Sequence, residues 1–316
     1  MKAYAYFPGC ALEKMAASYQ MSAVETARNL GVELKELEDW NCCGATAYFH
    51  IDELLAYTLC ARNLAMAERE KLDLVAPCSG CYKNIYFTNA HLKKDPDLAE
   101  HINFALKEDD LHFSGTIRVR HLIDVFVNDV GVEEIKKRVS HPLNGLRVAP
   151  YYGCQLLRPR KDHEDVEQPR FFEDLLTAIG AVAVKFPLKL RCCGGSLIVT
   201  NRKAALSMVH HLLENAVDQN AELVATVCPL CQINLECYQR QVNREFGTKF
   251  SMPVLYFTQL LGLALGIPPK RLGIGTEFIS AQPFRWLRDF TAKSAKSAEM
   301  LRQRGRNTRA RTGDSH

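Results

Sequence analysis

The chain has no long hydrophobic run and no visible targeting segment. Its longest apolar stretch, residues 254–267, has 14 residues and is interrupted by Thr258 and Gln259. This is too short for a helix that crosses a membrane. The amino terminus leads directly into a strand-like run and lacks the features of a secretory signal peptide. We therefore expect a cytoplasmic protein without a membrane span.

Several common functional motifs are also missing. No Walker A motif, dinucleotide-binding fingerprint or Ser/His/Asp pattern is present, so nucleotides and flavin are expected on other proteins. The net charge is +4, but residues 291–316 hold seven basic and two acidic residues, which leaves −1 on the other 290. No aromatic residue interleaves the charges of this tail, which disfavours nucleic-acid binding. We expect a solvated, partly helical extension.

Cysteine, in contrast, is abundant. The chain has twelve cysteines, which in a reducing compartment are more often metal ligands or redox groups than disulfides. Ten of them form two sets with the same order: one cysteine, a Cys-Cys-Gly motif, then C-x-x-C. In both sets 34 residues separate Cys-Cys from C-x-x-C. The sets are Cys10, Cys42, Cys43, Cys78 and Cys81, and Cys154, Cys192, Cys193, Cys228 and Cys231. Scattered structural cysteines would not repeat in this way.

Strand and helix patterns alternate in both halves of the chain. Short apolar runs predict strands at residues 4–7, 32–37, 72–76, 148–152, 181–186 and 222–225. Each half also holds a further strand that feeds a helix, at 117–123 and 254–260. Helices are expected at 17–30, 51–70, from Cys81 toward His91, and at 284–290.

This alternation predicts an α/β fold of two duplicated domains, each a small parallel sheet flanked by helices. We expect domains at 1–143 and 144–270, followed by an extension at 271–316 with the basic tail. Every cysteine group follows a predicted strand, and ligand sites of parallel sheets lie beyond the carboxyl ends of the strands. Helices that begin at these loops favour thiolates and an anionic cluster.

The number of cysteines favours a polymetallic cluster. Five thiolates per set exceed the four of a structural zinc site or of a cubane iron–sulfur cluster. Adjacent cysteines suit neighbouring irons better than one tetrahedral ion, and the absence of histidine from the pattern leaves iron–sulfur or zinc. The count favours an iron–sulfur cluster of unusual shape. A zinc-stabilised scaffold that docks partners is the alternative.

The double cysteine pattern resembles the cysteine-rich CCG domain pair in the B subunit of heterodisulfide reductase. The resemblance covers about residues 1–270 and includes the flanking residues 6–10 and 152–154. It implies a noncubane [4Fe–4S] cluster on each five-cysteine set, with the two clusters facing each other across a pseudo-twofold domain interface. Both sets are complete, so all ten cysteines carry over as ligands.

The family chemistry is cleavage or formation of a disulfide held between the two clusters. It implies three kinds of partner: an iron–sulfur electron carrier like the family's C subunit, a flavin-containing protein like its A subunit, and a small thiol/disulfide or lipoyl-carrier substrate. Residues 39–46 look more like the bacterial members and favour the sulfur-oxidising type. The alternative is a non-catalytic electron-transfer CCG subunit of a respiratory or lactate/glycolate-type oxidoreductase. Those proteins generally show less complete cysteine sets.

Three further residues are interpreted as structural. Cys60 lies within a predicted helix and Cys237 follows the second C-x-x-C, and neither belongs to the repeated pattern. Free cysteines are often core residues. His121 is expected to be a core or capping histidine.

Five basic residues lie close to the motif cysteines: Lys83, Arg158, Arg160, Lys189 and Arg191. Each is either a solvated charge or a compensating charge for an anionic cluster, substrate or partner. Arg191, directly before Cys192, is the strongest candidate for the second role.

Overall fold

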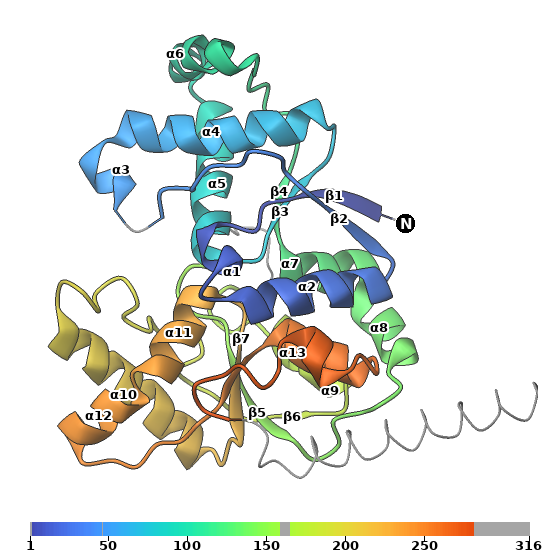
Figure 1. Cartoon of the computed structure of the whole chain (residues 1–316), viewed down its shortest axis with the longest axis vertical. Helices are drawn as coiled ribbons and strands as arrows, with labels where there is room; N and C mark the ends of the chain where they lie inside the picture. Colours follow the sequence, from blue (N-terminus) through green and yellow to red (C-terminus); the bar gives the residue numbers. More distant parts are fainter. Residues whose placement is uncertain (1, 46, 159–164, 281–316) are drawn as a thin grey trace, which may run out of the picture.

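The computed structural model describes residues 2–45, 47–158 and 165–280 and contains two four-stranded parallel sheets, one in each half of the chain (Figure 1). The first has the order β2-β1-β3-β4 and the second β6-β5-β7-β8. The strands are β1 (Lys2–Tyr6), β2 (Val32–Glu36), β3 (Leu74–Ala76), β4 (Val119–His121), β5 (Arg147–Tyr151), β6 (Val182–Ala183), β7 (Leu223–Thr226) and β8 (Val254–Tyr256). The same order in both sheets confirms the predicted fold of two duplicated α/β domains.

Helices cover both faces of each sheet. In the first half they are α1 (Cys10–Glu13), α2 (Ala17–Asn29), α3 (Tyr48–Ile51), α4 (Glu53–Arg69), α5 (Ser79–Leu92), α6 (Pro96–Leu106), α7 (Leu122–Asp124), the π-helix η2 (Val125–Gly131) and α8 (Val132–Arg138). A short 3-10 helix, η1 (Lys107–Asp109), follows α6. In the second half they are α9 (Phe171–Ala178), α10 (Arg202–Asp218), α11 (Pro229–Cys237), α12 (Gln239–Phe246), α13 (Phe257–Ala264) and the 3-10 helix η3 (Pro269–Leu272).

Two helix boundaries differ from the sequence expectation. The single helix expected at 51–70 is divided at Asp52, whose side chain accepts a hydrogen bond from Leu55 N–H at 2.9 Å and caps α4. The helix expected from Cys81 begins at Ser79, with Cys78 as its N-cap residue. The expected helix at 284–290, the basic tail and Arg160 lie outside the described residues.

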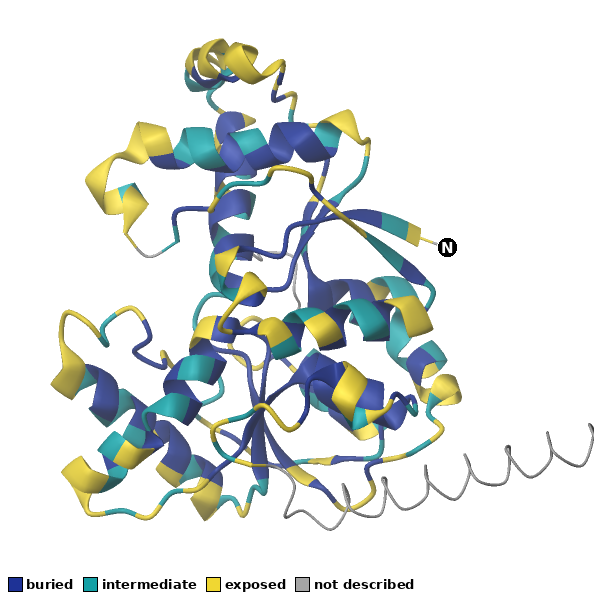
Figure 2. Ribbon diagram, viewed as in Figure 1, coloured by how far each residue is buried: buried dark blue, intermediate teal, exposed yellow. Residues whose placement is uncertain are grey.

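The burial of the strands explains the apolar runs in the sequence. The central strands β3 and β7 are buried along their whole length, as strands with helices on both faces must be (Figure 2). By contrast, α3 contains no buried residue and projects from the first half. No helix in the described ranges is long and apolar enough to cross a membrane.

The two halves pack through equivalent helices. Helix α2, which follows the first strand of the first sheet, packs against α13, which follows the last strand of the second. The reciprocal pair is α9 against α8, as expected for a pseudo-twofold arrangement. The first contact includes a hydrogen bond of 2.6 Å between Ser22 Oγ and Thr258 Oγ1. Tyr19 and Tyr256 stack across the same contact, with ring centroids 4.1 Å apart.

Candidate metal centre

The ten motif cysteines meet at the carboxyl ends of the two sheets and form one continuous row of thiols. Each thiol interacts electrostatically with the next, and the row crosses from one half to the other between Cys78 and Cys228. Its order is Cys10, Cys42, Cys43, Cys81, Cys78, Cys228, Cys231, Cys193, Cys192 and Cys154. The order in one half is therefore the reverse of the order in the other.

Close sulfur contacts lie within each half. Cys43 Sγ is 3.1 Å from Cys81 Sγ, and Cys193 Sγ is 3.6 Å from Cys231 Sγ. Cys43, Cys78, Cys81 and their counterparts are buried, whereas Cys10, Cys42 and Cys192 are exposed and Cys154 is half-buried. Each set therefore has buried thiols near the domain interface and accessible thiols at its outer end.

The thiol row favours cation binding. A hydrogen bond from Cys10 is the largest factor that lowers the pKa of Cys42 to about 2, and Cys154 acts in the same way on Cys192. The Cys10 and Cys154 pKa values rise, first because these thiols donate to their charged neighbours and then because of burial. Thiolates so close together repel one another. Metal ions would replace the shared protons and neutralise the set.

Backbone N–H groups also point at the sulfurs of each Cys-Cys pair. The Gly194 N–H donates to Cys192 Sγ at 3.3 Å, and the Gly44 N–H donates to Cys42. Both glycines have positive φ, 68° at Gly44 and 77° at Gly194, a backbone conformation that favours glycine. The glycine of each Cys-Cys-Gly motif thus turns the chain so that its N–H faces the thiolate.

A second pair of glycines permits the close approach of the first cysteine loop. A Cβ atom on Gly9 would lie 3.0 Å from Cys81 Sγ, and one on Gly153 would lie 3.1 Å from Cys231 Sγ. Their φ values are 75° and 70°. Glycine directly before the first cysteine of each set therefore avoids a steric clash and also adopts a backbone conformation that other residues rarely adopt.

Two asparagines that the sequence interpretation missed hold the Cys-Cys loops. Asn84 Nδ2 donates to Cys43 C=O at 3.3 Å, and Asn234 Nδ2 donates to Cys193 C=O. Their positions are equivalent, because each follows the last cysteine of its C-x-x-C by three residues. The repeated pattern C-x-x-C-x-x-N was the signal that could have identified them.

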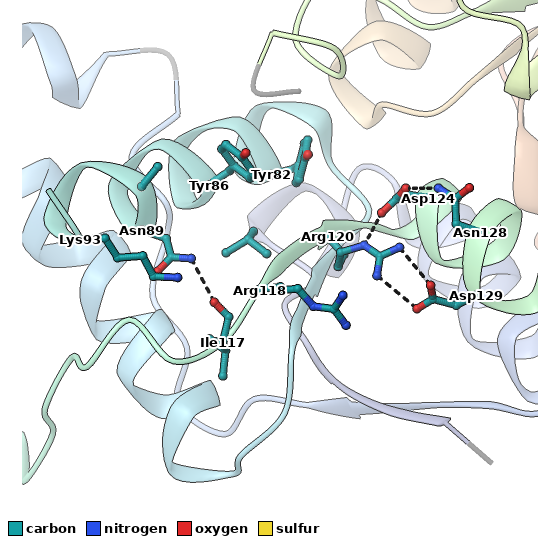
Figure 3. A pocket seen from close by; sticks show the side chains of 12 residues that line it. Tyr82, Tyr86, Asn89, Lys93, Ile117, Arg118, Arg120, Asp124, Asn128 and Asp129 are labelled. Atoms are coloured by element: carbon teal, nitrogen blue, oxygen red, sulfur yellow. Dashed lines mark hydrogen bonds and ion pairs between the residues drawn. The ribbon is translucent and has the colours of Figure 1, made fainter. Parts of the chain in front are cut away.

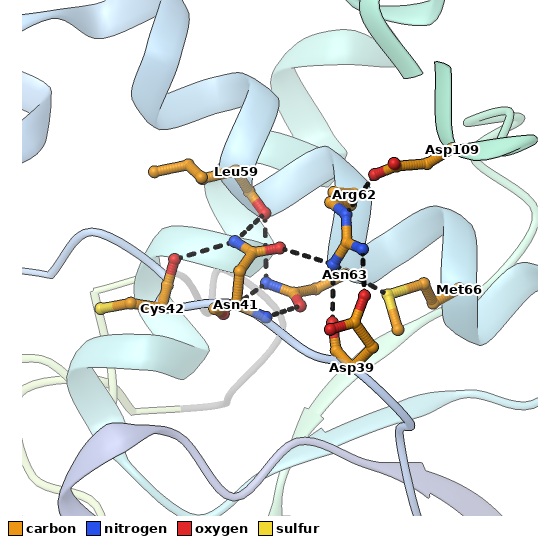
Figure 4. A network of polar contacts seen from close by, with 8 residues as sticks. All are labelled: Asp39, Asn41, Cys42, Leu59, Arg62, Asn63, Met66 and Asp109. Atoms are coloured by element: carbon orange, nitrogen blue, oxygen red, sulfur yellow. Dashed lines mark hydrogen bonds and ion pairs between the residues drawn. The ribbon is translucent and has the colours of Figure 1, made fainter. Parts of the chain in front are cut away.

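The loop before Cys42 is fixed by a polar network (Figure 4). Asn41 N–H donates to Asn63 Oδ1 at 3.1 Å, and Asn63 Nδ2 donates to Asn41 C=O at 3.0 Å. Arg62 binds the Asp39 carboxylate at 2.5 Å and the Asp109 carboxylate at 2.6 Å. These bonds to α4 hold the chain on the amino-terminal side of the Cys-Cys pair.

Tyr19 joins the loops at which the row crosses between the halves. Its hydroxyl lies 3.1 Å from Pro77 C=O and 3.1 Å from Val227 C=O, the residues directly before Cys78 and Cys228. The Tyr19 ring is fully buried against Tyr256. The domain interface therefore holds these two cysteines together.

The outer ends of the two sets differ in charge. An opening of about 720 Å³ beside Cys10 is lined by four acidic residues, Glu13, Glu36, Glu38 and Asp39, with Leu37 and Trp40. At the other end, the exposed Arg158 interacts electrostatically with Cys192. Lys83, half-buried on α5, lies near Arg158 and Cys154. The first opening disfavours anions and the second favours them.

The remaining candidate residues have mostly structural positions. Lys189 is paired with Glu173 at 2.6 Å, and Arg191 is exposed.

Cys60 is buried and donates to Cys43 C=O at 3.3 Å, and Cys237 is half-buried. His121 is buried, and its Nδ1 accepts from Ile123 N–H at 3.3 Å at the start of α7, which confirms the capping interpretation.

The donor set fits an iron–sulfur group. No three His, Cys, Asp or Glu side chains within residues 2–45, 47–158 and 165–280 are arranged to hold a single metal ion. Each half instead offers five soft thiols along a row, with N–H donors directed at their sulfurs. Thiolates of this kind, supported by hydrogen bonds to sulfur, are the ligands of iron–sulfur clusters.

The cysteine-rich domain family, CCG, matches residues 4–86 and 148–236, once in each half. The matched segments contain both five-cysteine sets and cover more than half of the chain. The chain belongs to this family.

Among its relatives is the B subunit of ferredoxin:CoB–CoM heterodisulfide reductase of Methanosarcina mazei. The two are 35% identical over 87% of this chain and 93% of that relative. The 8-methylmenaquinol:fumarate reductase membrane anchor subunit of Wolinella succinogenes is 38% identical, over 89% of this chain and 98% of the relative. The chain is thus similar over most of its length to the B subunit of heterodisulfide reductase.

A solved structure shows the same fold. A hypothetical protein from Helicobacter pylori superposes with a TM-score of 0.71 at 18% identity. The superposition covers 89% of this chain but only 52% of the other, so the present chain spans about half of its length. At this identity the likeness concerns the fold alone.

Proposed function

We propose that this protein is the iron–sulfur catalytic subunit of a heterodisulfide reductase-like complex. In this proposal Cys10, Cys42, Cys43, Cys78 and Cys81 bind one noncubane [4Fe–4S] cluster. Their counterparts Cys154, Cys192, Cys193, Cys228 and Cys231 bind the second. The complex would exchange electrons between a thiol/disulfide substrate and a partner iron–sulfur protein. The single observation that carries the proposal is the meeting of the two cysteine sets at the domain interface, where the Tyr19 hydroxyl bonds to the residues directly before Cys78 and Cys228.

Two clusters in this position would supply one-electron steps at two adjacent points, which suits the two-electron thiol/disulfide couple. The protein's contribution is to hold the two sets close together. The stacked Tyr19 and Tyr256 fix the halves, and the Tyr19 hydroxyl joins the loops before Cys78 and Cys228. Asn84 and Asn234 fix the Cys-Cys loops in the same way in each half.

Residues at the second end of the row would orient an acidic substrate. Lys83 and Arg158 come from different halves and lie near Cys154. Their positive charges favour a carboxylate or another acid group, whereas the acidic opening at Cys10 would repel one. Under the proposal an acidic thiol or disulfide therefore enters beside Cys154.

Anaerobic purification followed by iron analysis and a turnover assay tests this function. We expect about eight iron atoms per chain and reduction of disulfides by the assembled complex when a reduced dye supplies electrons. Negligible iron with one or two bound zinc ions would contradict the proposal and favour the zinc scaffold. Full iron content without any thiol/disulfide turnover would contradict the catalytic part.

The second candidate is a non-catalytic electron-transfer subunit. The observation that favours it is the likeness to the membrane anchor of a quinol:fumarate reductase, whose whole length matches this chain at 38% identity. The same two clusters would then carry electrons between partner proteins. In this case the purified complex would couple quinol oxidation to fumarate reduction, and disulfides would neither be reduced nor inhibit it.

The finer assignments are part of the same proposal. They comprise an iron–sulfur partner like the family's C subunit, a flavin-containing partner like its A subunit, a cytoplasmic location, and a preference for sulfur-oxidising pathways with lipoyl carriers. The domain limits 1–143, 144–270 and 271–316 also stay predictions. Identification of the proteins that co-purify with the chain checks the partners directly.

A further inference from the structure

The two cysteine sets have the same ligands but opposite charges beside them. Counted back from the Cys-Cys pairs, residues 36–41 and 186–191 occupy the same places in the two halves. Residues 36–41 include three acidic residues and no basic one, whereas residues 186–191 include two basic residues and no acidic one. The chain directly before each pair of thiols is therefore acidic in the first half and basic in the second.

Ion pairs reduce this contrast but do not remove it. The paired residues are Asp39, bound by Arg62, and Lys189, bound by Glu173. Within residues 2–45, 47–158 and 165–280, no ion pair involves Glu36, Glu38 or Arg191. Glu36 and Glu38 line the opening beside Cys10 together with Glu13. Their negative charges therefore lie at the outer end of the first set.

Each outer cysteine also lies near the helix that follows the C-x-x-C motif of the other half. Helix α1, which begins at Cys10, contacts α11. In the second half, Lys83 on α5 interacts electrostatically with Cys154 and Arg158. Lys83 and Ile233 have equivalent positions, because each follows the last cysteine of its C-x-x-C by two residues, and both are half-buried. The helix that reaches the second set thus carries a cation where the helix that reaches the first set carries an apolar side chain.

The charge of Lys83 acts mainly on the second set. Among the motif cysteines its largest interaction is with Cys154, followed by Cys43. No carboxylate pairs with Lys83 in the described part of the chain, and because its side chain is half-buried, water screens its charge less than the charge of an exposed residue. The exposed Arg158 adds a second positive charge that interacts with Cys192.

Other charges around α5 are balanced or remote. Figure 3 shows a groove of about 550 Å³ along another face of this helix. The ion pairs of the groove join Arg118 to Asp73 and Arg120 to Asp124 and Asp129. Lys93 also lines the groove, but it follows Lys83 by ten residues, about 15 Å along the helix. The groove therefore adds little charge near the sulfurs.

The charges are the main difference between the two sites. The hydrogen bonds from the glycine N–H groups and from Asn84 and Asn234 are the same in both halves. The potential of an iron–sulfur group depends on such hydrogen bonds, on net charge and on solvent exposure. Cys154 is less exposed than Cys10, which acts against reduction of the second set. One unit charge about 10 Å away changes electron affinity roughly tenfold at an effective dielectric constant of about 20, so several charges of the same sign outweigh this difference in exposure.

We infer that these charges make the two sets unequal, so that an iron–sulfur group on the second set accepts an electron more readily than one on the first. The residues that favour the added electron at the second set are Lys83, Arg158 and Arg191, and those that oppose it at the first set are Glu13, Glu36 and Glu38. The inference rests on the proposed function, which supplies the iron–sulfur groups and the electron donor. For each electron accepted, the partner iron–sulfur protein is oxidised by one electron. Electrons that enter at the first set would move toward the second, where the cations would hold an acidic substrate.

Redox titration followed by electron paramagnetic resonance tests the inference. Cys43→Ala is expected to retain iron in the second set only, and Cys193→Ala in the first set only. We expect the midpoint potential of Cys43→Ala to be higher by at least about 59 mV, which is a tenfold difference in electron affinity for a one-electron step. Equal potentials, or a higher potential in Cys193→Ala, would overturn the inference.

Charge variants in the same two backgrounds identify the residues responsible. Lys83→Met should lower the electron affinity of the second set about tenfold and that of the first set less. Lys83→Arg, which keeps the charge, should give the parental value. Lys136→Met, at an exposed position on α8, is the matched control and should change neither potential. Equal shifts of both sets by Lys83→Met, or an equal effect of the control, would contradict the role of Lys83.

A variant at an exposed position tests the acidic side independently of folding. Glu38→Gln should raise the electron affinity of the first set by a smaller factor, because water screens its charge, and no change there would contradict the role of the acidic opening. Disulfide turnover by the complex with the parental chain reports separately on the proposed function. Unequal potentials without turnover would contradict the catalytic function and leave the inference intact, whereas turnover with equal potentials would overturn the inference alone.

Discussion

The two halves of the molecule agree at the thiol row and differ around it. Both have the same strand order, the same glycines beside the sulfurs and the same asparagine behind the Cys-Cys loop. Their outer ends differ, since one opening is acidic and the other lies near Lys83 and Arg158. The two halves therefore share the arrangement of their cysteines and of the groups that hold them, and they differ in the charges around the two outer ends.

The largest expected effect concerns the equivalence of the two sets. Cys43→Ala and Cys193→Ala should each remove about four of the eight expected irons, because each thiol is buried within one set. Iron analysis with the visible spectrum of anaerobic protein checks this. If either single change emptied both sites while the fold stayed intact, the assignment of two separate sites would be wrong.

A smaller effect concerns the buried Glu236 of the second half, whose counterpart in the first half is the uncharged Tyr86. Burial raises the pKa of Glu236 to about 7, so the folded protein binds a proton there more tightly than the unfolded chain. The stabilisation is present at low pH and is lost as pH rises from about 4.5 to about 7. At pH 8 we expect Glu236→Gln to be more stable than the parent by roughly 2–3 kcal/mol.

Denaturant unfolding at pH 5 and at pH 8 measures this difference. The exposed Glu214→Gln on α10 is the matched control and should behave like the parent at both values. The same pH dependence in the parent and in Glu236→Gln would show that the buried carboxyl is not responsible.

Replacing the glycine before the first cysteine of each set with alanine should have the same effect on stability and iron content in both halves. Gly9→Ala and Gly153→Ala place a methyl group against Cys81 and Cys231 and should each destabilise the protein by about 1–2 kcal/mol. They should also reduce iron incorporation. Gly31→Ala, with a similar φ of 75° but no atom within 4 Å of the added Cβ, should cost about 1 kcal/mol without loss of iron. Equal iron loss in all three would refute the steric role.

The smallest expected effect lies in the basic tail, which has no cysteine and follows both repeats. A chain truncated after Phe290 should incorporate iron as the parent does. Loss of iron from the truncated chain would show that the tail takes part in cluster assembly.

The strands and cysteine loops could be predicted because their signals are local. Apolar runs followed at once by motif cysteines mark β1, β3, β5 and β7. The division between α3 and α4 could not be predicted from periodicity, because the apolar pattern continues past Asp52 and only its capping bond separates the helices. The crossing between Cys78 and Cys228 depends on the packing of α2 against α13, a contact between distant segments that no spacing encodes.

The contacts in which the two halves differ could not be predicted from the sequence. Asn89 and Gln239 occupy equivalent positions, but Asn89 bonds only to Ile117 C=O, whereas the longer Gln239 bonds to both the N–H and the C=O of Met252. The charge difference at the two ends of the row likewise arises from residues of both halves. Lys83 lies on α5, yet it interacts with Arg158 and Cys154 of the second half.

The central claim is that the two thiol sets act together on one disulfide. The most direct test is thiol/disulfide turnover by the assembled complex with Cys43→Ala or Cys193→Ala, each checked to retain iron in the other set. We predict that turnover falls at least about 100-fold in both variants, while electron acceptance by the remaining iron–sulfur group persists. Near-parental turnover by either variant would contradict the claim and leave the lost site as a relay or a structural element.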